Sequence, residues 1–89
     1  MTIRWSETAG DALEDLHGYI ALHGGRTVAA EIVHSLCRLI ERLQSYPRMG
    51  RAGRVAGTSE LSHPPYVIVY QIAENVINIV DIFDGRRQR

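Results

Sequence analysis

The sequence predicts an α+β fold in which an antiparallel pair of helices packs on one face of a small, mainly antiparallel sheet. Residues 3–5 form a strand-like opening, two amphipathic helical patterns follow, and two β-branched runs occupy the last third of the chain. The implied order is one strand, two helices and then three strands. A chain of 89 residues has room for one hydrophobic core, so residues 1–89 are expected to form a single domain.

The first helix is expected to begin near Glu7. Ser6 is a good N-cap, and the carboxylate of Glu7 suits the positive end of the helix dipole. Apolar residues recur at spacings of three and four and predict one buried face, made of Ala9, Ala12, Leu13, Leu16 and Ile20. Gly24 and Gly25 are expected to end this helix.

A second helix is expected between Thr27, which would be its N-cap, and Pro47, which would stop it. Its predicted apolar face consists of Val28, Ile32, Leu36, Leu39, Ile40 and Leu43. The short Gly-Gly connection favours an antiparallel helical hairpin, whose apolar faces need a further surface to cover them.

The last third of the chain is expected to supply that surface. Residues 66–72 and 76–83 are β-branched and aromatic, and the short break between them predicts a β-hairpin. A strand around residues 59–61 would have to end before Pro64 and Pro65.

The segment between the second helix and these strands is expected to be a loop. Residues 46–57 are rich in glycine, which argues against a helix. The loop could grade into a strand near Arg54 and Val55.

The composition excludes several classes of protein. Ten arginines balance ten acidic residues, so no overall field attracts nucleic acid or a membrane, and the absence of lysine excludes a lysine base. No apolar stretch approaches the roughly 20 residues that span a bilayer, and the N-terminus lacks a secretion signal, so we expect a cytoplasmic protein. His34 and Cys37 alone do not make a metal site, and we expect no metal and no cofactor.

Two groups of arginines are the candidate binding residues. Arg48, Arg51 and Arg54 lie in the glycine-containing loop, where they could bind phosphate, pair with an acidic protein or simply be solvated. Arg86, Arg87 and Arg89 follow the last predicted strand, in the ending Arg86-Arg87-Gln88-Arg89, and form either a target-contact tail or a solubilising terminus.

Other side chains have both a chemical and a structural interpretation. Tyr66 and Tyr70 share one sheet face, where a phenol could stack on a base or move a proton, but packing under the helices is the favoured role. Asp81 and Asp84 are expected to pair with the terminal arginines.

The chain resembles the ParE/RelE superfamily of bacterial toxins, closer to ParE and its plasmid stabilisation proteins. In the first half, the resemblance rests on Ala9, Asp15-Leu16, Tyr19-Ile20 and Pro47-Arg48-Met49-Gly50-Arg51. In the second half, it rests on Ser59-Glu60-Leu61, Pro65-Tyr66-Val67-Ile68-Val69-Tyr70 and Val80-Asp81-Ile82-Phe83-Asp84-Gly85-Arg86-Arg87.

This resemblance implies the toxin of a type II toxin-antitoxin system, encoded beside its cognate antitoxin. The antitoxin's C-terminal segment is then expected to drape over the helices and the sheet. The antitoxin-binding candidates are Leu13, Tyr19, Ile20, Arg38 and Arg54.

Departures from the family pattern favour ParE-like inhibition of DNA gyrase over RelE-like cleavage of mRNA on the ribosome. The RNA-cleaving members use lysines and arginines to stabilise charge, whereas this chain has no lysine and has Val67 where an arginine is frequent. Asp84 stands where many relatives have histidine, and Ser59 where many have arginine.

The departures therefore imply no catalytic residue and a gyrase inhibitor as the first expectation. Its target-contact candidates are Arg86 and Arg87, with Arg48 and Arg51 as secondary ones. The alternatives are a ribosome-dependent mRNA endoribonuclease, a degenerate toxin that only binds antitoxin, and a scaffolding module unrelated to toxicity.

Overall fold

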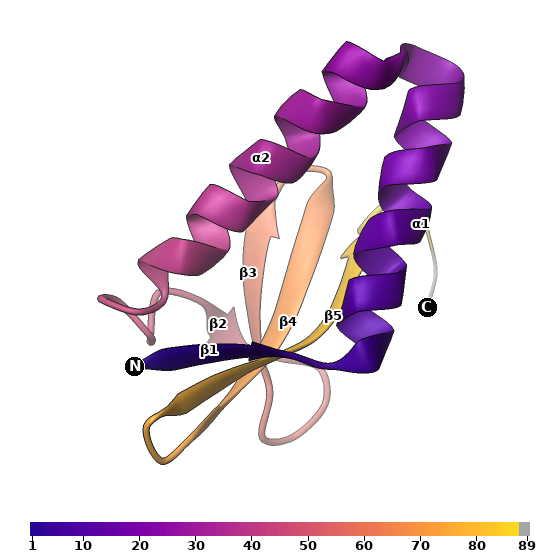
Figure 1. Cartoon of the computed structure of the whole chain (residues 1–89). Helices are drawn as coiled ribbons and strands as arrows, with labels where there is room; N and C mark the ends of the chain where they lie inside the picture. Colours follow the sequence, from indigo (N-terminus) through magenta and orange to yellow (C-terminus); the bar gives the residue numbers. More distant parts are fainter. Residues whose placement is uncertain (88–89) are drawn as a thin grey trace.

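Two helices pack on one face of a five-stranded sheet in the computed structural model, which describes residues 1–87 (Figure 1). The elements are β1 (Thr2–Trp5), α1 (Glu7–Gly24), α2 (Arg26–Arg42), β2 (Arg51–Ala52), β3 (Ser59–His63), β4 (Tyr66–Ala73) and β5 (Val76–Asp84). The strand order is β1-β5-β4-β3-β2, with β1 parallel to β5 and all other neighbours antiparallel. This confirms the predicted α+β fold.

The loop after α2 contains one strand more than predicted. Arg51 and Ala52 pair with Glu60 and Ser59, so four strands follow the helices instead of three. The strand expected near Arg54 and Val55 is wrong, because the chain turns there and the backbone N–H of Thr58 donates back to the Val55 carbonyl at 3.1 Å.

The start of α1 follows the prediction, but the junction with α2 does not. The Ser6 hydroxyl caps α1 by accepting from the Ala9 N–H at 3.0 Å. Gly25, with φ at +94°, is both the C-cap of α1 and the N-cap of α2, so Thr27 lies inside α2 and is not its cap. A left-handed φ favours glycine, which explains how two helices join through one residue.

Helix α2 ends at Arg42, before Pro47 is reached. The Leu43 N–H donates to the Ile40 carbonyl at 3.0 Å, which tightens the last turn, and Leu43 is still fully buried. The predicted apolar face is correct at Leu36 and Ile40 but wrong at Val28, which is 43% exposed. Val28 lies near the turn of the helical hairpin, which extends past the sheet in Figure 1.

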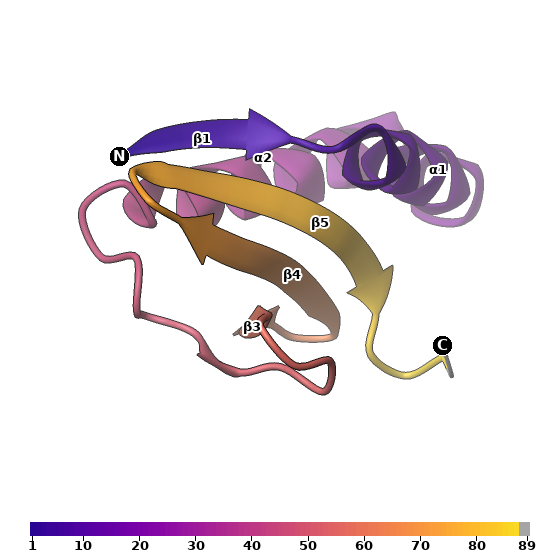
Figure 2. The same cartoon turned by 90° about the horizontal axis from the view of Figure 1, so that it is seen from below.

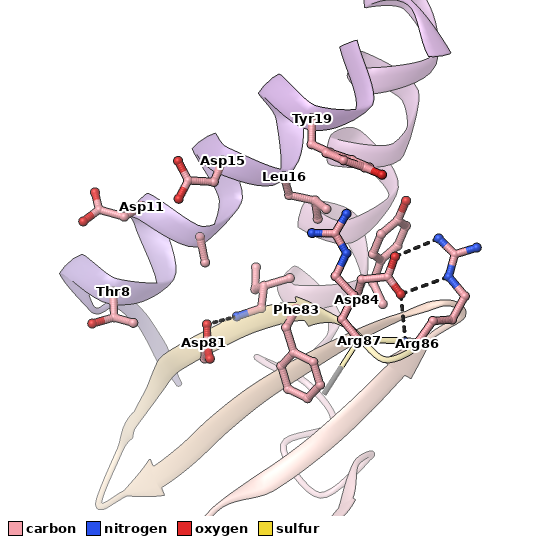
Figure 3. Close-up of a pocket in the computed structure, with 13 residues that line it drawn as sticks. Thr8, Asp11, Asp15, Leu16, Tyr19, Asp81, Phe83, Asp84, Arg86 and Arg87 are labelled. Atoms are coloured by element: carbon pink, nitrogen blue, oxygen red, sulfur yellow. Dashed lines mark hydrogen bonds and ion pairs between the residues drawn. The ribbon is translucent and has the colours of Figure 1, made fainter. Parts of the chain in front are cut away.

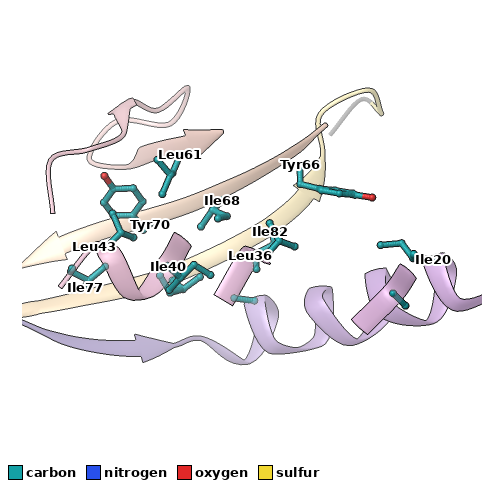
Figure 4. Close-up of a cluster of buried hydrophobic side chains, with 13 residues drawn as sticks. Ile20, Leu36, Ile40, Leu43, Leu61, Tyr66, Ile68, Tyr70, Ile77 and Ile82 are labelled. Carbon is teal, nitrogen blue, oxygen red and sulfur yellow. The ribbon is translucent and has the colours of Figure 1, made fainter. Parts of the chain in front are cut away.

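The core lies between the helices and one face of the sheet (Figure 4). On that face Ile68 is opposite Ile82, Tyr70 opposite Ile79, and Ile72 opposite Ile77. The pairing shifts between Val69 and Tyr70 and leaves Val80 as an extra residue in β5. This bulge brings Ile79 and Ile82 to the same face although an uninterrupted strand would point them to opposite faces.

Among residues 1–87, neither helix is long and apolar enough to cross a membrane.

Candidate functional site

Strand β1 covers only the first half of β5, and this leaves a groove beside α1. The pairing of β1 with β5 stops at Trp5 and Ile79. The chain then turns into α1 at Ser6, whose N–H donates to the Ile79 carbonyl and whose hydroxyl donates to the Val80 carbonyl, both at 3.0 Å. A groove of about 480 Å³ results between α1 and the C-terminal half of β5 (Figure 3).

One wall of the groove is a stripe of α1. Spacings of three and four place its members on one side of the helix, and they are Thr8, Asp11, Ala12, Asp15, Leu16 and Tyr19. Asp11 and Asp15 are exposed and give this wall a negative charge. Ala12, Leu16 and Ile82 provide apolar surface between the acidic wall and the strand.

The far end of the groove is formed by a hydrogen-bonded C-terminal turn. The Arg86 guanidinium donates twice to the Asp84 carboxylate, at 3.1 Å from Nε and 2.7 Å from Nη2, and the Arg86 N–H donates to the same group at 2.9 Å. The side-chain hydrogen bond from Arg86 is the main cause that lowers the pKa of Asp84, and the same bond raises the pKa of Arg86. The predicted pairing of Asp84 with a terminal arginine is confirmed.

Gly85 fastens this turn to the β3–β4 hairpin. Its N–H donates to the Pro65 carbonyl at 2.6 Å. A Cβ at this position would approach that oxygen to 3.0 Å and a methyl group of Val67 to 3.2 Å, so the close contact favours glycine. Arg87 then turns back over α1, where its guanidinium lies 4.4 Å from the ring centroid of Tyr19.

Arg51 and Arg54 lie elsewhere, on the sheet face opposite the helices, and both are held by Glu60. Glu60 is only 6% exposed and accepts from the Arg54 backbone N–H at 3.0 Å. Its carboxylate is also 3.6 Å from Arg54 Nε and 3.9 Å from Arg51 Nη2. The Arg54 guanidinium lies 5.4 Å from the ring centroid of Phe83, so it covers β5 from the outer side.

The two hairpin tyrosines pack under the helices, as predicted. Tyr66 is 8% exposed and Tyr70 is fully buried. The Tyr70 hydroxyl donates to the Pro47 carbonyl and accepts from the Gly50 N–H, both at 2.9 Å. Its role is to fasten the loop that carries Arg48.

Arg48 lies beside the C-terminal end of α2 and apart from the other loop arginines. It lines a hollow with Arg42 and Tyr46, and Arg42 lines a neighbouring groove with Arg38. The candidates Arg86 and Arg87 line the α1–β5 groove instead. The sequence-based candidates therefore separate into three places on the surface.

The antitoxin-binding candidates are also dispersed. Tyr19 lines the α1–β5 groove and is 47% exposed, whereas Leu13 packs partly against the core and Ile20 is 7% exposed. The sequence analysis missed Asp11 and Asp15 as groove residues. Their spacing of four along one helix was the available signal, but a favourable helix dipole also explained it.

No three His, Cys, Asp or Glu side chains of residues 1–87 lie close enough together to hold a metal ion. Burial is the main cause that raises the pKa of the Cys37 thiol, and nearby Glu41 adds to it. Cys37 is therefore less easily ionised than an ordinary cysteine.

Comparison with known proteins gives a consistent result for sequence and for fold. Residues 3–89 match the family model described as ParE toxin of type II toxin-antitoxin system, parDE. A curated protein named "Putative toxin Y4kP" from Sinorhizobium fredii is 34% identical over 88 residues, which cover 97% of this chain and 90% of that protein.

Solved structures share the fold at lower identity. A chain of the chromosomal ParDE system from P. aeruginosa superposes with a TM-score of 0.86 at 20% identity, covering 94% of this chain and 95% of that one. A chain of the RelBE2 toxin-antitoxin complex from Mycobacterium tuberculosis has a TM-score of 0.71 at 20% identity, with coverages of 93% and 95%. A chain of the E. coli RelBE complex has a TM-score of 0.68 at 16% identity, with coverages of 99% and 98%.

Proposed function

The chain belongs to the ParE toxin family of type II toxin-antitoxin systems, and we propose that it inhibits DNA gyrase by binding and is silenced by an antitoxin seated in the α1–β5 groove. Membership of this family makes the chain the toxin of a type II toxin-antitoxin system. The choice of gyrase over messenger RNA, and the location of the antitoxin, are the proposal.

The burial and pairing of the residues in and after the β4–β5 hairpin favour gyrase binding over RNA cleavage. Cutting a phosphodiester requires a proton-transfer group beside free cations. In this chain Tyr66 and Val67 are each 8% exposed, and Asp84 is occupied by Arg86. The resemblance to RNA-cleaving members would call for a general base and an arginine at these positions. In this chain the positions expose neither group to solvent.

The charge and shape of the α1–β5 groove favour a partner segment with cationic and apolar residues. Asp11 and Asp15 would pair with cations of that segment, while Leu16 and Tyr19 offer apolar contact between them. Strand β1 pairs with β5 only as far as Ile79, and the Ile82 N–H beyond it already donates to the Asp81 carboxylate at 2.8 Å, so side-chain contacts in the groove carry this proposal.

Occupation of this groove would explain neutralisation directly. Arg86 and Arg87 form its far end and are the first candidates for contact with gyrase. An antitoxin segment lying there would cover both arginines. Silencing is then occlusion of the target-contact residues, without a change in the fold of the toxin.

The activity test uses the full chain, purified with its neighbouring gene product and freed from it. We expect dose-dependent loss of gyrase supercoiling, intact messenger RNA in a ribosome assay, and growth arrest on induction. Cleavage of message on the ribosome would replace the proposal with the RelE-like alternative. Growth without arrest would indicate a degenerate antitoxin-binding module or a scaffolding role.

The target-contact test compares two single arginine variants. Arg87→Ala is expected to weaken gyrase inhibition at least about tenfold, while Arg4→Ala leaves it unchanged, because Arg4 is an exposed arginine of β1 that does not line the groove. Full inhibition by folded Arg87→Ala would remove Arg87 from the target surface.

The antitoxin test uses a matched pair on the same helix. Asp11→Asn combined with Asp15→Asn is expected to weaken antitoxin binding about tenfold or more, with most of the loss in the dissociation rate. Glu14→Gln is the control, because Glu14 is equally exposed but does not line the groove. Equal losses for both variants would refute a seat in this groove.

A further inference from the structure

Three arginines at or just after the C-terminal end of α2 differ from Arg51, Arg54 and Arg86 in their ion pairing. Arg38, Arg42 and Arg48 are exposed, and within residues 1–87 no carboxylate lies at ion-pair distance from them. Arg51, Arg54 and Arg86, by contrast, are each paired with a carboxylate. We call Arg38, Arg42 and Arg48 the basic end of α2.

Two adjoining hollows meet at this basic end, because Arg42 lines both. The larger, of about 710 Å³, lies between the C-terminal part of α2 and the end of β3 with the following turn. It is lined by hydrogen-bonding side chains, among them Ser35, Gln44, Ser45, Ser62 and His63. Glu41 is the one acidic residue lining it, so the basic end keeps a net positive charge.

The smaller hollow, of about 530 Å³, is an apolar slot between two guanidinium groups. Tyr46, Pro47 and Met49 line it, with Arg42 and Arg48 beside them. Tyr46 is 61% exposed, so its side chain is accessible to a partner. The Tyr70 hydroxyl holds both Pro47 and Gly50 at 2.9 Å, which fixes the backbone of the slot in advance of binding.

We propose that this surface binds single-stranded nucleic acid, with a base stacked in the slot on Tyr46 and the flanking phosphates on Arg42, Arg48 and Arg38. Arginine pairs with phosphate through two parallel hydrogen bonds, and an aromatic ring stacks on any base. The hydroxyl, amide and imidazole groups of the larger hollow supply further donors to the backbone. The inference does not depend on whether gyrase or messenger RNA is the target.

An acidic protein segment is the less fitting occupant. It would use the guanidinium groups but would place nothing planar against Tyr46. A duplex also fits less well, since its bases are stacked on one another and are not free to enter the slot. A single strand uses the cations, the donors and the slot together.

The test measures anisotropy of labelled 12-residue oligonucleotides with the full chain between about 50 and 200 mM salt. Single-stranded DNA and RNA of one sequence, a DNA duplex and polyglutamate are compared. We expect single strands to bind best, with a slope of log affinity against log salt near −2, because about three phosphates are neutralised. Preference between the DNA and RNA strands identifies the source of the ligand.

Variants separate the two parts of the surface. Arg42→Gln with Arg48→Gln is expected to flatten the salt slope by about 1 to 2. Tyr46→Ala should weaken single-strand binding about fivefold or more at every salt concentration while the slope is retained.

Arg26→Gln is the matched control for charge, since Arg26 is an exposed arginine at the other end of the same helix. If Arg26→Gln weakens binding as much per removed charge as Arg42→Gln with Arg48→Gln, the attraction is non-specific and the proposal fails. Duplex binding as tight as single-strand binding would overturn the stacking slot. Polyglutamate binding at equal ionic strength without single-strand binding would show that the surface meets acidic protein instead.

Discussion

Arg48 and Arg54 lie six positions apart in one loop but belong to different faces of the molecule. Arg54 is fixed on the outer face of the sheet by Glu60 and lies over Phe83. Arg48 is exposed beside Arg42, at the end of α2. The difference shows that proximity along the chain does not make these arginines one binding site.

The path of the loop is the cause. Pro47 and Gly50 are tied to Tyr70, whose side chain faces the helices, and Arg54 is tied to Glu60, whose side chain faces away from them. Figure 2 shows the chain passing around the edge of the sheet between these points. Gly50 permits this crossing, because a Cβ there would lie 2.7 Å from both the Glu60 carbonyl and the Tyr70 hydroxyl.

The largest effect on stability is expected from Glu60→Ala. This change removes the acceptor of the Arg54 N–H and both ion pairs of the held arginines, so the free energy of unfolding should fall by about 2–3 kcal/mol. Urea denaturation followed by circular dichroism measures the loss. Glu41→Ala is the control, because Glu41 is exposed at the basic end of α2, and its effect should stay below about 0.5 kcal/mol. Similar losses of unfolding free energy in the two variants would contradict the distinction between the outer face of the sheet and the basic end of α2.

A smaller loss is expected from Tyr70→Phe. It leaves the ring in the core but deprives the Pro47 carbonyl and the Gly50 N–H of their partner, which should cost about 1–2 kcal/mol of unfolding free energy. Tyr46→Phe is the control, because Tyr46 is exposed, and it should change the free energy of unfolding by less than about 0.5 kcal/mol. A neutral Tyr70→Phe in thermal and urea unfolding would mean that the hydroxyl does not anchor the loop.

The comparison of the two loop arginines is sharpest in a pair of single substitutions. Arg54→Ala loses the ion pair to Glu60 and the contact over Phe83 and should lower stability by about 1 kcal/mol. Arg48→Ala loses neither and should lie within about 0.5 kcal/mol of the parent protein. For affinity to single-stranded nucleic acid we expect the reverse, with a larger loss in Arg48→Ala than in Arg54→Ala. The same order in both measurements would contradict the separation of the loop arginines.

The smallest effect concerns the pair between the exposed Arg86 and the partly buried Asp84. Because Arg86 lowers the pKa of Asp84, the pair stabilises the turn above the ordinary carboxyl pKa and loses this contribution as pH falls through the lowered pKa. The NMR signal of the Arg86 Nε–H should therefore move only in acid, below about pH 4. In Asp84→Asn that signal should not titrate, and thermal stability at neutral pH should fall slightly, because the charged pair is lost. A titration retained in Asp84→Asn would assign it to another group.

Local sequence signals predicted most of the fold. Ser6 caps α1, Gly25 ends it, and the β-branched runs form the β4–β5 hairpin, since each depends on residues close together in the chain. Errors arose where a local signal had a competitor. Thr27 is a good cap by residue type, but the positive φ of Gly25 starts α2 first.

The candidate site was less predictable than the fold. Residue type and the family pattern pointed to Tyr19, Arg86 and Arg87, and all three line the α1–β5 groove. Asp11 and Asp15 were not chosen, because an acidic helix start needs no partner to explain it. They line a groove only because β5 lies opposite α1, and no local sequence pattern indicates that arrangement.

The sequence by itself determined the membership of the ParE toxin family and the types and order of all elements except β2, because periodicity, capping and turn residues act over a few positions. Tertiary structure alone decided that β1 stops at Ile79, that Val80 bulges out of β5, and that Glu60 takes two of the three loop arginines. These features depend on contacts between segments far apart in the chain, so the packed core selects them and the local pattern does not.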